Sequence, residues 1–324
     1  MLEQFRQILE ADLKKFYNEL HLKSEQLNQP IAHILSLGGK RMRPLMAMIS
    51  NQMFNGKLDD VLPAALAIEV FHNFTLVHDD IMDNAPLRRG KATVHEKWNN
   101  SVAILSGDAM MIKAYQFFEK MNPTHFVKIF PLFNQTALEV CEGQQLDMDF
   151  ENKSKIHPND YIEMIKLKTA VLLGCSMQIG AITANANNAD AKRMYEFGLN
   201  LGIAFQLDDD ILDVYAESEV FGKQVGGDIL ANKKTLLLLS LMEKVNETDN
   251  VLLQQLLSNN FAEGTDKVKE VTALYNKYFI REEATAVKNQ YYQIALNQIK
   301  DLSIDAGHKK MLQSFAESIV NRTY

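Results

Sequence analysis

Apolar residues recur at spacings of three and four along almost the whole chain, which is the pattern of amphipathic α-helices. The first stretch, residues 2–20, shows it in Leu2, Phe5 and Leu9. Alternating runs of Val, Ile and Thr between turn residues, the pattern of β-strands, are missing. Further helices are expected at about 43–54, 60–84, 91–121, 126–150, 159–183, 189–216, 232–245, 249–258, 265–278, 281–300 and 306–322. The sequence therefore predicts an all-α fold, a single-domain helical bundle over residues 1–324 with short connections.

Charge and cysteine usage exclude several classes of protein. The net charge of -7 argues against a surface for nucleic acid. Cys141 and Cys175 are the two cysteines and form no CxxC pair, which argues against a zinc site and a disulfide framework. Residues 1–16 carry charges every few positions and do not resemble a signal peptide. Because no apolar stretch reaches about 18 uncharged residues, we expect a cytoplasmic protein without a stable membrane anchor.

The pattern Asp-Asp-x-x-Asp occurs twice, at 79–83 and at 209–213, each time after an apolar run. On a helix, the first and last acids of the pattern share one face, where like charges repel without a cation. A solvated acidic helix end would explain one such cluster, but two with identical spacing favour a metal site. Carboxylates without His or Cys suit Mg²⁺, which usually shares its coordination shell with phosphates. The candidate metal ligands are Asp79, Asp80, Asp83, Asp209, Asp210 and Asp213.

Short basic segments accompany the acidic clusters. They are "GGKRMRP" at 38–44, "LRRG" at 87–90, "KLKTA" at 166–170 and "FGKQVGGDILANKKT" at 221–235. Each segment alone is typical of a surface turn or a solvated face. Glycines followed by basic residues at the start of a helix also suit an anion. Together with two acidic clusters, these segments favour a bound diphosphate.

With "GQQLD" at 143–147 and "FQLDDDILD" at 205–213, these segments resemble the successive signatures of the trans-isoprenyl diphosphate synthase (polyprenyl synthetase) family, short-chain type. The resemblance covers residues 30–240 in order. It implies an isoprenoid synthase fold around a central cavity between the two aspartate-bearing helices, and a homodimer. It also implies three Mg²⁺ ions per active site. The implied substrates are isopentenyl diphosphate and an allylic diphosphate, which is dimethylallyl, geranyl or farnesyl diphosphate.

The resemblance also assigns roles to residues. Those implied to face the allylic diphosphate are Arg88, Lys168, Thr169, Gln206, Lys223 and Lys233. Those that match the pocket for isopentenyl diphosphate are Gly39, Lys40, Arg43, His72 and Arg89. The implied catalytic set is Asp79, Asp80, Asp83, Arg88, Lys168, Thr169, Gln206 and Asp209. Metal and basic groups would stabilise the charge on the leaving diphosphate, and a dry cavity would protect the allylic cation from water.

Two aromatic residues upstream of the first acidic cluster bear on product length. Phe74 lies five residues before Asp79, about 7.5 Å along a helix. In the family that the chain resembles, an aromatic residue there tends to block elongation, and Phe71 lies one turn further on the same side. Ordinary core packing of the two rings remains an alternative. We expect a C15–C20 product, with a longer-chain synthase as the alternative.

Two other functions remain open from the sequence. A terpene cyclase also uses an Asp-rich helix and Mg²⁺, but it would not need a second diphosphate pocket, which "GGKRMRP" and "RRG" suggest. A non-catalytic subunit of a heteromeric synthase typically lacks one or both Asp motifs, whereas this chain has both. The sequence therefore favours a prenyltransferase.

Overall fold

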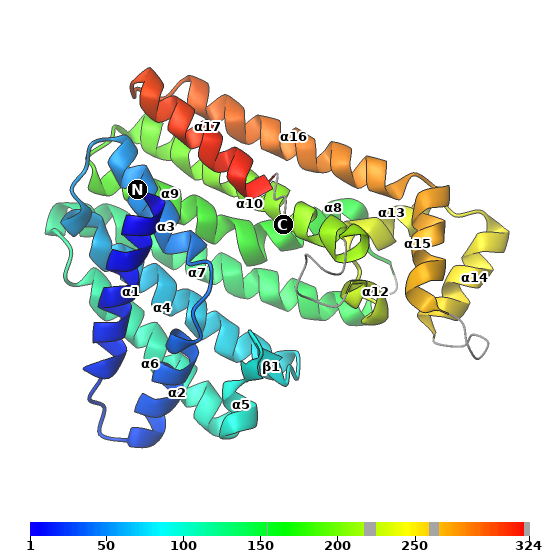
Figure 1. Cartoon of the computed structure of the whole chain (residues 1–324), viewed down its shortest axis with the longest axis horizontal. Coiled ribbons are helices and arrows are strands. Elements are labelled where there is room, and N and C mark those ends of the chain that lie inside the picture. The colour runs from blue at the N-terminus through cyan, green and yellow to red at the C-terminus, as the bar shows by residue number, and fades with distance from the viewer. Residues whose placement is uncertain (154, 217–224, 259–265, 321–324) are drawn as a thin grey trace. The chain divides into compact units, whose positions relative to one another are not determined.

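The computed structural model is almost entirely helical, which confirms the predicted all-α class (Figure 1). The structure describes residues 1–153, 155–216, 225–258 and 266–320. The chain forms two compact units, of which unit 1 comprises residues 1–135 and 175–195, and unit 2 comprises residues 136–174 and 196–324. The boundaries fall within three long helices, α7 (Pro123–Asn152), α9 (Val171–Thr183) and α10 (Asn188–Tyr215).

Unit 1 contains the first acidic cluster and the helices around it. Its other elements are α1 (Leu2–Asn18), α2 (Glu25–Ser36), α3 (Met42–Met53), α4 (Leu58–Met82), β1 (Leu87–Arg88), β2 (Lys91–Ala92), α5 (Val94–Lys97) and α6 (Asn100–Phe118). The strands β1 and β2 form an antiparallel pair with Leu87 opposite Ala92. In Figure 1 this strand pair follows the end of α4, the end that carries the acidic cluster.

Helix α4 is the centre of unit 1. Its buried side chains run from Val61 to Asp80 and include every residue from 64 to 71. Such a helix is apolar on all sides because other helices surround it. By length and composition, α4 and the segment Pro158–Thr183 could cross a membrane, but 67% of each apolar window is buried inside the protein. Both segments therefore fit the core of a soluble protein.

Unit 2 contains the second acidic cluster, on α10. Its other elements are α8 (Pro158–Ile165), the π-helical turn η1 (Lys166–Ala170), α12 (Gly227–Leu230), α13 (Leu236–Lys244), α14 (Glu247–Leu257), α15 (Lys267–Lys277), α16 (Ile280–Lys300) and α17 (Ala306–Val320). Helix α7 passes close to η1 at Gly143, where a Cβ atom would lie 2.6 Å from the Cα of Lys168. A glycine is needed there because any side chain would collide with the backbone of η1.

The elements depart from the predicted ranges in several places. Helix α2 is absent from the predicted set, and the helix predicted over 91–121 begins only at Asn100. Lys91 and Ala92 pair with β1 instead, and the backbone at Trp98 and Asn99, with φ angles of -119° and -172°, is not helical. Helix α4, predicted to reach residue 84, ends at Met82, and Asp83 is its C-cap residue.

Candidate active site

The first acidic cluster lies at the carboxyl end of α4. Asp80 is fully buried, Asp79 is half-buried and Asp83 is exposed. The Asp83 amide donates to the carbonyl oxygen of Asp79 at 2.8 Å, which closes the last turn of the helix. The three carboxylates therefore gather at the negative end of the helix dipole, where anions are least stable. A cation nearby would relieve this repulsion.

Arg88 compensates one oxygen of the buried Asp80 carboxylate. Its Nε and Nη2 atoms both donate to Oδ1, at 2.7 and 2.5 Å. The other oxygen, Oδ2, is buried and has no hydrogen-bond partner among the residues that the structure describes. A buried carboxylate oxygen without a partner is costly. This oxygen and the chemistry of the donor set therefore fit a hard cation such as Mg²⁺.

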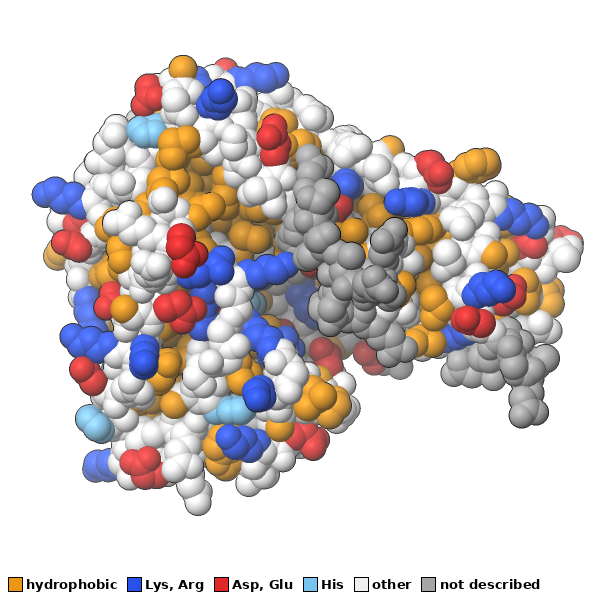
Figure 2. All heavy atoms as spheres, viewed as in Figure 1, with side chains coloured by type: hydrophobic (Ala, Val, Ile, Leu, Met, Phe, Trp, Pro, Cys, Tyr) orange, Lys and Arg blue, Asp and Glu red, His pale blue; other side chains and the backbone are white. Residues whose placement is uncertain are grey.

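The next residue, Arg89, reaches a different part of unit 1. Its Nη1 atom donates to the carbonyl oxygen of Gly38. A Cβ atom on Gly39, whose φ is 129°, would lie 2.6 Å from the guanidinium carbon of Arg89. The two adjacent arginines thus extend to two places, and Gly39 provides the space that Arg89 occupies. Lys and Arg side chains gather over and beside the strand pair on the face that Figure 2 shows.

Arg43 and His72 are two further residues of the predicted isopentenyl diphosphate pocket, which with Gly39, Lys40 and Arg89 we call the basic group of unit 1. Nη1 of Arg43 donates to Nε2 of His72 at 3.2 Å, so the imidazole accepts and its proton lies on Nδ1. Burial, followed by the positive charge of Arg43, holds the pKa of His72 well below its ordinary value. Burial lowers the pKa of Arg43 to about 10, so Arg43 stays charged at neutral pH. A cation next to a neutral imidazole is therefore retained inside the protein, where it can attract an anion.

The other basic residues of "GGKRMRP" differ from Arg43 in their surroundings. Lys40 is exposed. Arg41 is buried and its guanidinium contacts Glu10 at 2.8 Å, Glu69 at 2.6 Å and the carbonyl oxygen of Leu35 at 2.7 Å. These contacts tie α1 and α4 to the end of α2. Arg41 is therefore a structural residue, whereas Arg43, two positions later, faces the basic group.

The two aromatic residues proposed to limit product length are both buried, to different degrees. Phe71 is 1% exposed and packs edge-on against Phe133, with ring centroids 5.0 Å apart. Phe74 is 8% exposed, and its ring centroid lies 5.4 Å from that of Phe71. Phe71 is therefore part of the core, while Phe74 lies at its margin.

The aspartates in and next to the second cluster on α10 have different hydrogen-bond and ion-pair partners. Asp208, which directly precedes the cluster, pairs with Lys288 of α16 at 2.8 Å. Asp210 is buried and accepts hydrogen bonds from Tyr161 and, at 3.1 Å, from Gln206. Asp213 accepts from the backbone amide of Asp228 at 3.0 Å. Both oxygens of Asp210 are thus occupied by donors within the protein.

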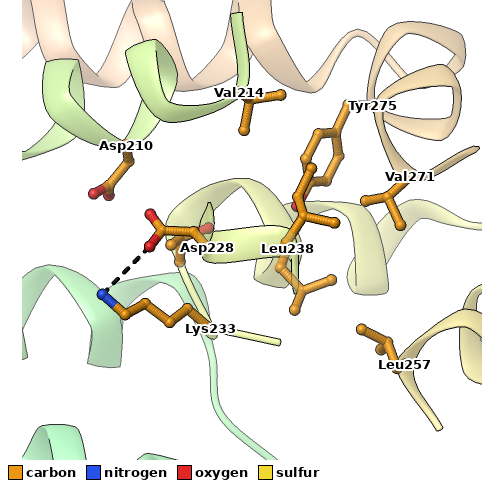
Figure 3. A pocket seen from close by; sticks show the side chains of 10 residues that line it. Asp210, Val214, Asp228, Lys233, Leu238, Leu257, Val271 and Tyr275 are labelled. Atoms are coloured by element: carbon orange, nitrogen blue, oxygen red, sulfur yellow. Dashed lines mark ion pairs between the residues drawn. The ribbon is translucent and has the colours of Figure 1, made fainter. Parts of the chain in front are cut away.

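The pKa of Asp210 lies close to physiological pH, so its carboxyl group is partly protonated there. Burial raises its pKa to about 7, and the charges of Asp228 and Asp209 raise it too, against the hydrogen bonds from Tyr161 and Gln206. In Figure 3, Asp210 points from α10 toward the ion pair between Asp228 and Lys233, whose charged atoms are 3.3 Å apart. Desolvation alone would lower the pKa of Lys233, but these carboxylates outweigh it and the pKa is raised. Lys233 is therefore held as a cation beside the cluster.

Two lysines of unit 2 differ in role as Arg41 and Arg43 do in unit 1: one lies at the site and the other is structural. Lys168, in η1, pairs with Asp147 at 2.5 Å, and Thr169 follows it in the same turn. Lys234 instead donates to the carbonyl oxygens of Phe150 and Lys153 at 2.5 and 2.7 Å, where it caps the end of α7. Lys168 and Lys233 thus stand beside carboxylates that an anionic ligand could replace, whereas Lys234 is structural. Lys223 lies outside the described residues.

The predicted site residues therefore form one group in each unit. Within the described parts of the chain, no set of three or more His, Cys, Asp or Glu side chains is arranged so as to hold a metal ion by itself. Three residues were missed by sequence reasoning: Asp147, Tyr161 and Asp228. Asp147 ends the quoted segment "GQQLD" and Asp228 lies within "VGGDIL", so both could have been weighed. Tyr161 precedes Lys168 by seven residues, two helical turns, which is a weak signal.

Comparisons with known proteins agree on one family. A sequence model of the polyprenyl synthetase family matches residues 24–277. The chain is 34% identical to the geranylgeranyl diphosphate synthase of Saccharolobus solfataricus over 96% of this chain and 98% of that protein. It is 31% identical to the geranylfarnesyl diphosphate synthase of Aeropyrum pernix, over 94% of this chain and 96% of that protein. The crystal structure of a geranylgeranyl pyrophosphate synthase superposes with a TM-score of 0.93 at 42% identity, covering 100% of this chain and 99% of the other.

Proposed function

The chain belongs to the polyprenyl synthetase family, and we propose that it joins isopentenyl diphosphate head-to-tail, in the trans configuration, to an allylic diphosphate. It is a prenyltransferase and makes a short-chain prenyl diphosphate. The observation that carries the proposal is the divergence of two adjacent arginines. Arg88 contacts the acidic cluster and Arg89 contacts Gly38. A condensation of two diphosphates needs two such anion sites, whereas a terpene cyclase needs one.

We propose that Mg²⁺, three ions per active site, is held by Asp79, Asp80, Asp83 and Asp209. When bound, the metal would neutralise the charge on the diphosphate leaving group. The partnerless Oδ2 of Asp80 supports this assignment. Asp210 and Asp213 are assigned a supporting position beside Asp209, because oxygens of both accept hydrogen bonds within the protein.

The residues proposed to bind the allylic diphosphate are cations and hydrogen-bond donors. Lys168 and Lys233 would exchange Asp147 and Asp228 for phosphate oxygens, and Arg88 would contribute a third cation. Such positioned charges stabilise the negative charge that develops as the allylic carbon–oxygen bond breaks. Thr169 and Gln206 present polar side chains to the allylic cation. Lys223 is proposed for the same site from the sequence.

Isopentenyl diphosphate is proposed to bind the basic group of unit 1, made of Gly39, Lys40, Arg43, His72 and Arg89. Arg43 and Arg89 would hold the diphosphate, and the neutral His72 fixes the direction of the Arg43 guanidinium. The substrate would then present its double bond to the allylic cation. Loss of a proton to the released diphosphate completes the reaction and makes a separate protein base unnecessary.

The product is proposed to be C15–C20, because Phe74 and Phe71 would close the path of the growing chain. Of the relatives named above, the geranylgeranyl synthases support the C20 end of this range, and the geranylfarnesyl synthase supports the longer-chain alternative. A longer-chain synthase remains the second candidate. It would require Phe74 to lie out of the path, as ordinary core packing of that ring would permit.

We further propose one catalytic domain over residues 1–324, a homodimer, and a cytoplasmic location without nucleic-acid partners or a membrane anchor. The surface of α6 supports the dimer. Its side chains Ile104, Leu105 and Ile112 are 46%, 57% and 53% exposed, and Leu105 and Ile112 lie two turns apart on one side. Apolar side chains gathered on one helix face suit contact with a second copy of the chain.

The test is to incubate the purified protein with Mg²⁺, isopentenyl diphosphate and each allylic primer in turn, and to size the products. The proposal expects products longer than the primer by multiples of five carbons. Consumption of the primer without isopentenyl diphosphate would indicate a terpene cyclase. No product from any primer would indicate a non-catalytic subunit.

A further inference from the structure

An aromatic stripe on α4 connects the core of unit 1 to the first acidic cluster. It consists of Phe71, Phe74 and His78, at positions i, i+3 and i+7, which share one side of a helix. The ring centroids of Phe71 and Phe74 lie 5.4 Å apart, and those of Phe74 and His78 lie 4.8 Å apart. The planes of Phe74 and His78 meet at 72°, an edge-to-face contact that favours one ring orientation over others. Phe74 is therefore enclosed between two rings.

Helix α6 holds the His78 end of the stripe. Nε2 of His78 donates to the carbonyl oxygen of Ile104 at 3.1 Å and lies 3.9 Å from a carboxylate oxygen of Asp108. The imidazole lies directly over Gly107, where a Cβ atom would come within 2.5 Å of Cδ2. Gly107 thus leaves a slot that the ring of His78 fills, and the hydrogen bond fixes the ring in that slot.

The other end of the stripe is fixed by the core. Phe71 is 1% exposed and packs edge-on against Phe133, at 5.0 Å between centroids. Phe74 itself has no polar group and retains 8% of its exposure, so its orientation depends on its two neighbours. Because Phe71 cannot move without opening the core, the neighbour that can change is His78.

We propose that His78 and Gly107 are positioning residues for product length: Gly107 leaves the slot for His78, and the imidazole fixes the ring of Phe74 across the path of the growing chain. The inference rests on the proposed role of Phe74. It adds that the length limit is set jointly by α4 and α6, and that it can be shifted by residues that touch neither substrate.

The experiment compares His78→Ala, Phe74→Ala and the double variant, each supplied with Mg²⁺, isopentenyl diphosphate and a farnesyl primer, with products sized by reversed-phase radio-TLC. Loss of one edge-to-face contact should raise the ratio of longer to shorter products about two- to tenfold in His78→Ala. Phe74→Ala should raise the ratio further. The double variant should match Phe74→Ala, because His78 acts through Phe74.

Further variants test two separate features. Substitutions of His78 distinguish the effect of its ring from that of its hydrogen bond, and a substitution of Gly107 tests the slot on α6. His78→Phe keeps a ring beside Phe74 and should keep a product profile nearer to that of the wild type than His78→Asn does. Gly107→Ala should change the profile by displacing the imidazole, and it should add nothing in the His78→Ala background, where the slot is empty. If one of these variants folds poorly, the others still test the contact between His78 and Phe74.

Phe16→Ala serves as the matched control. Phe16 packs edge-on against Phe117 of α6 at 5.0 Å, and Phe117 lies about 15 Å along the helix from Gly107, so removal of the Phe16 ring should leave the product profile unchanged. A wild-type profile for His78→Ala beside a lengthened profile for Phe74→Ala would overturn the inference alone. Additive shifts in the double variant would also overturn it. An unchanged profile for Phe74→Ala would overturn the inference together with the proposed length block, while condensation itself would still stand.

Discussion

Two nitrogens of Arg88 bind one carboxylate oxygen of Asp80, while the second oxygen of that carboxylate is buried and has no partner among the described residues. An arginine can also bind a carboxylate through both oxygens at once, which would satisfy the whole group. Here the arginine occupies one oxygen, and the other is left for a further ligand. Asp80 therefore links the stability of unit 1 to the proposed metal site.

This link makes a prediction about folding stability. In metal-free buffer, Arg88→Ala should lower the free energy of unfolding by about 3 kcal/mol, because it leaves the buried charge of Asp80 uncompensated. Adding Asp80→Asn should restore much of that loss, since the amide carries no charge. Urea unfolding of the two single variants and the double variant measures the coupling. Equal effects of Arg88→Ala in both backgrounds would show that the pair is not coupled.

The acidic residues make a prediction about turnover. Asp79→Ala and Asp209→Ala should each lower the steady-state rate of condensation by orders of magnitude while the circular dichroism spectrum stays native. Asp208→Asn is the matched control, because Asp208 adjoins the second cluster but pairs with Lys288 of α16. It should keep wild-type turnover. Near-normal rates for either alanine variant would remove that residue from the metal site.

The helical fold could be predicted because apolar spacing is a local property that each segment carries by itself. The turn at Arg89 and Gly90 could not, since both positions have positive φ angles and the contacts of Arg88 with Asp80 and of Arg89 with Gly38 are made with other segments of the chain. The predicted helix over 91–121 was too long because Lys91 and Ala92 pair with β1 as a strand, and this pairing is not visible in the local pattern. Local patterns predict elements well, and they predict the breaks between elements less well.

Residue type alone also could not assign neighbouring basic residues. Arg41 and Arg43 are two positions apart, yet Arg41 is held by Glu10 and Glu69 while Arg43 contacts His72. Only the packing of α1 against α4 distinguishes them. Within the acidic run, the same holds for Asp208, which pairs with a helix 80 residues further along the chain.

The lowered pKa of His72 predicts how the free energy of unfolding depends on pH. Its pKa in the folded protein lies well below 6.5, so the unfolded chain binds more protons as the pH falls through that value. The free energy of unfolding should therefore fall with pH below about 7, by up to about 1.4 kcal/mol per pH unit from this group. His72→Gln keeps an acceptor for Arg43 and should remove that part of the slope. Parallel stability curves for the two proteins between pH 7.5 and 5 would contradict the assignment.

Substitution of Gly39 should affect the binding of isopentenyl diphosphate and not that of the allylic substrate. In Gly39→Ala the new methyl would meet the guanidinium of Arg89 at 2.6 Å. The KM for isopentenyl diphosphate should therefore rise about tenfold, equivalent to 1.4 kcal/mol, while the KM for the allylic substrate changes little.

Gly38→Ala is the control for backbone strain in the Gly39 experiment. Gly38 also has a positive φ, 74°, but its Cβ would meet no atom within 4 Å. It should raise the KM for isopentenyl diphosphate less than Gly39→Ala does. Equal increases for both substrates in Gly39→Ala would show a general loss of structure and would contradict the pocket.

The two phenylalanines of α4 should separate stability from product length. Phe71 is fully buried between Phe133 and Phe74, so Phe71→Ala should cost about 3–5 kcal/mol of unfolding free energy through the cavity that it leaves. Phe74 lies at the margin of the core, so Phe74→Ala should cost less and should lengthen the product. Urea unfolding and reversed-phase radio-TLC on the same preparations measure both effects. If Phe74→Ala destabilises the protein as much as Phe71→Ala and leaves chain length unchanged, both rings are ordinary core residues, and the length limit must lie elsewhere in the chain.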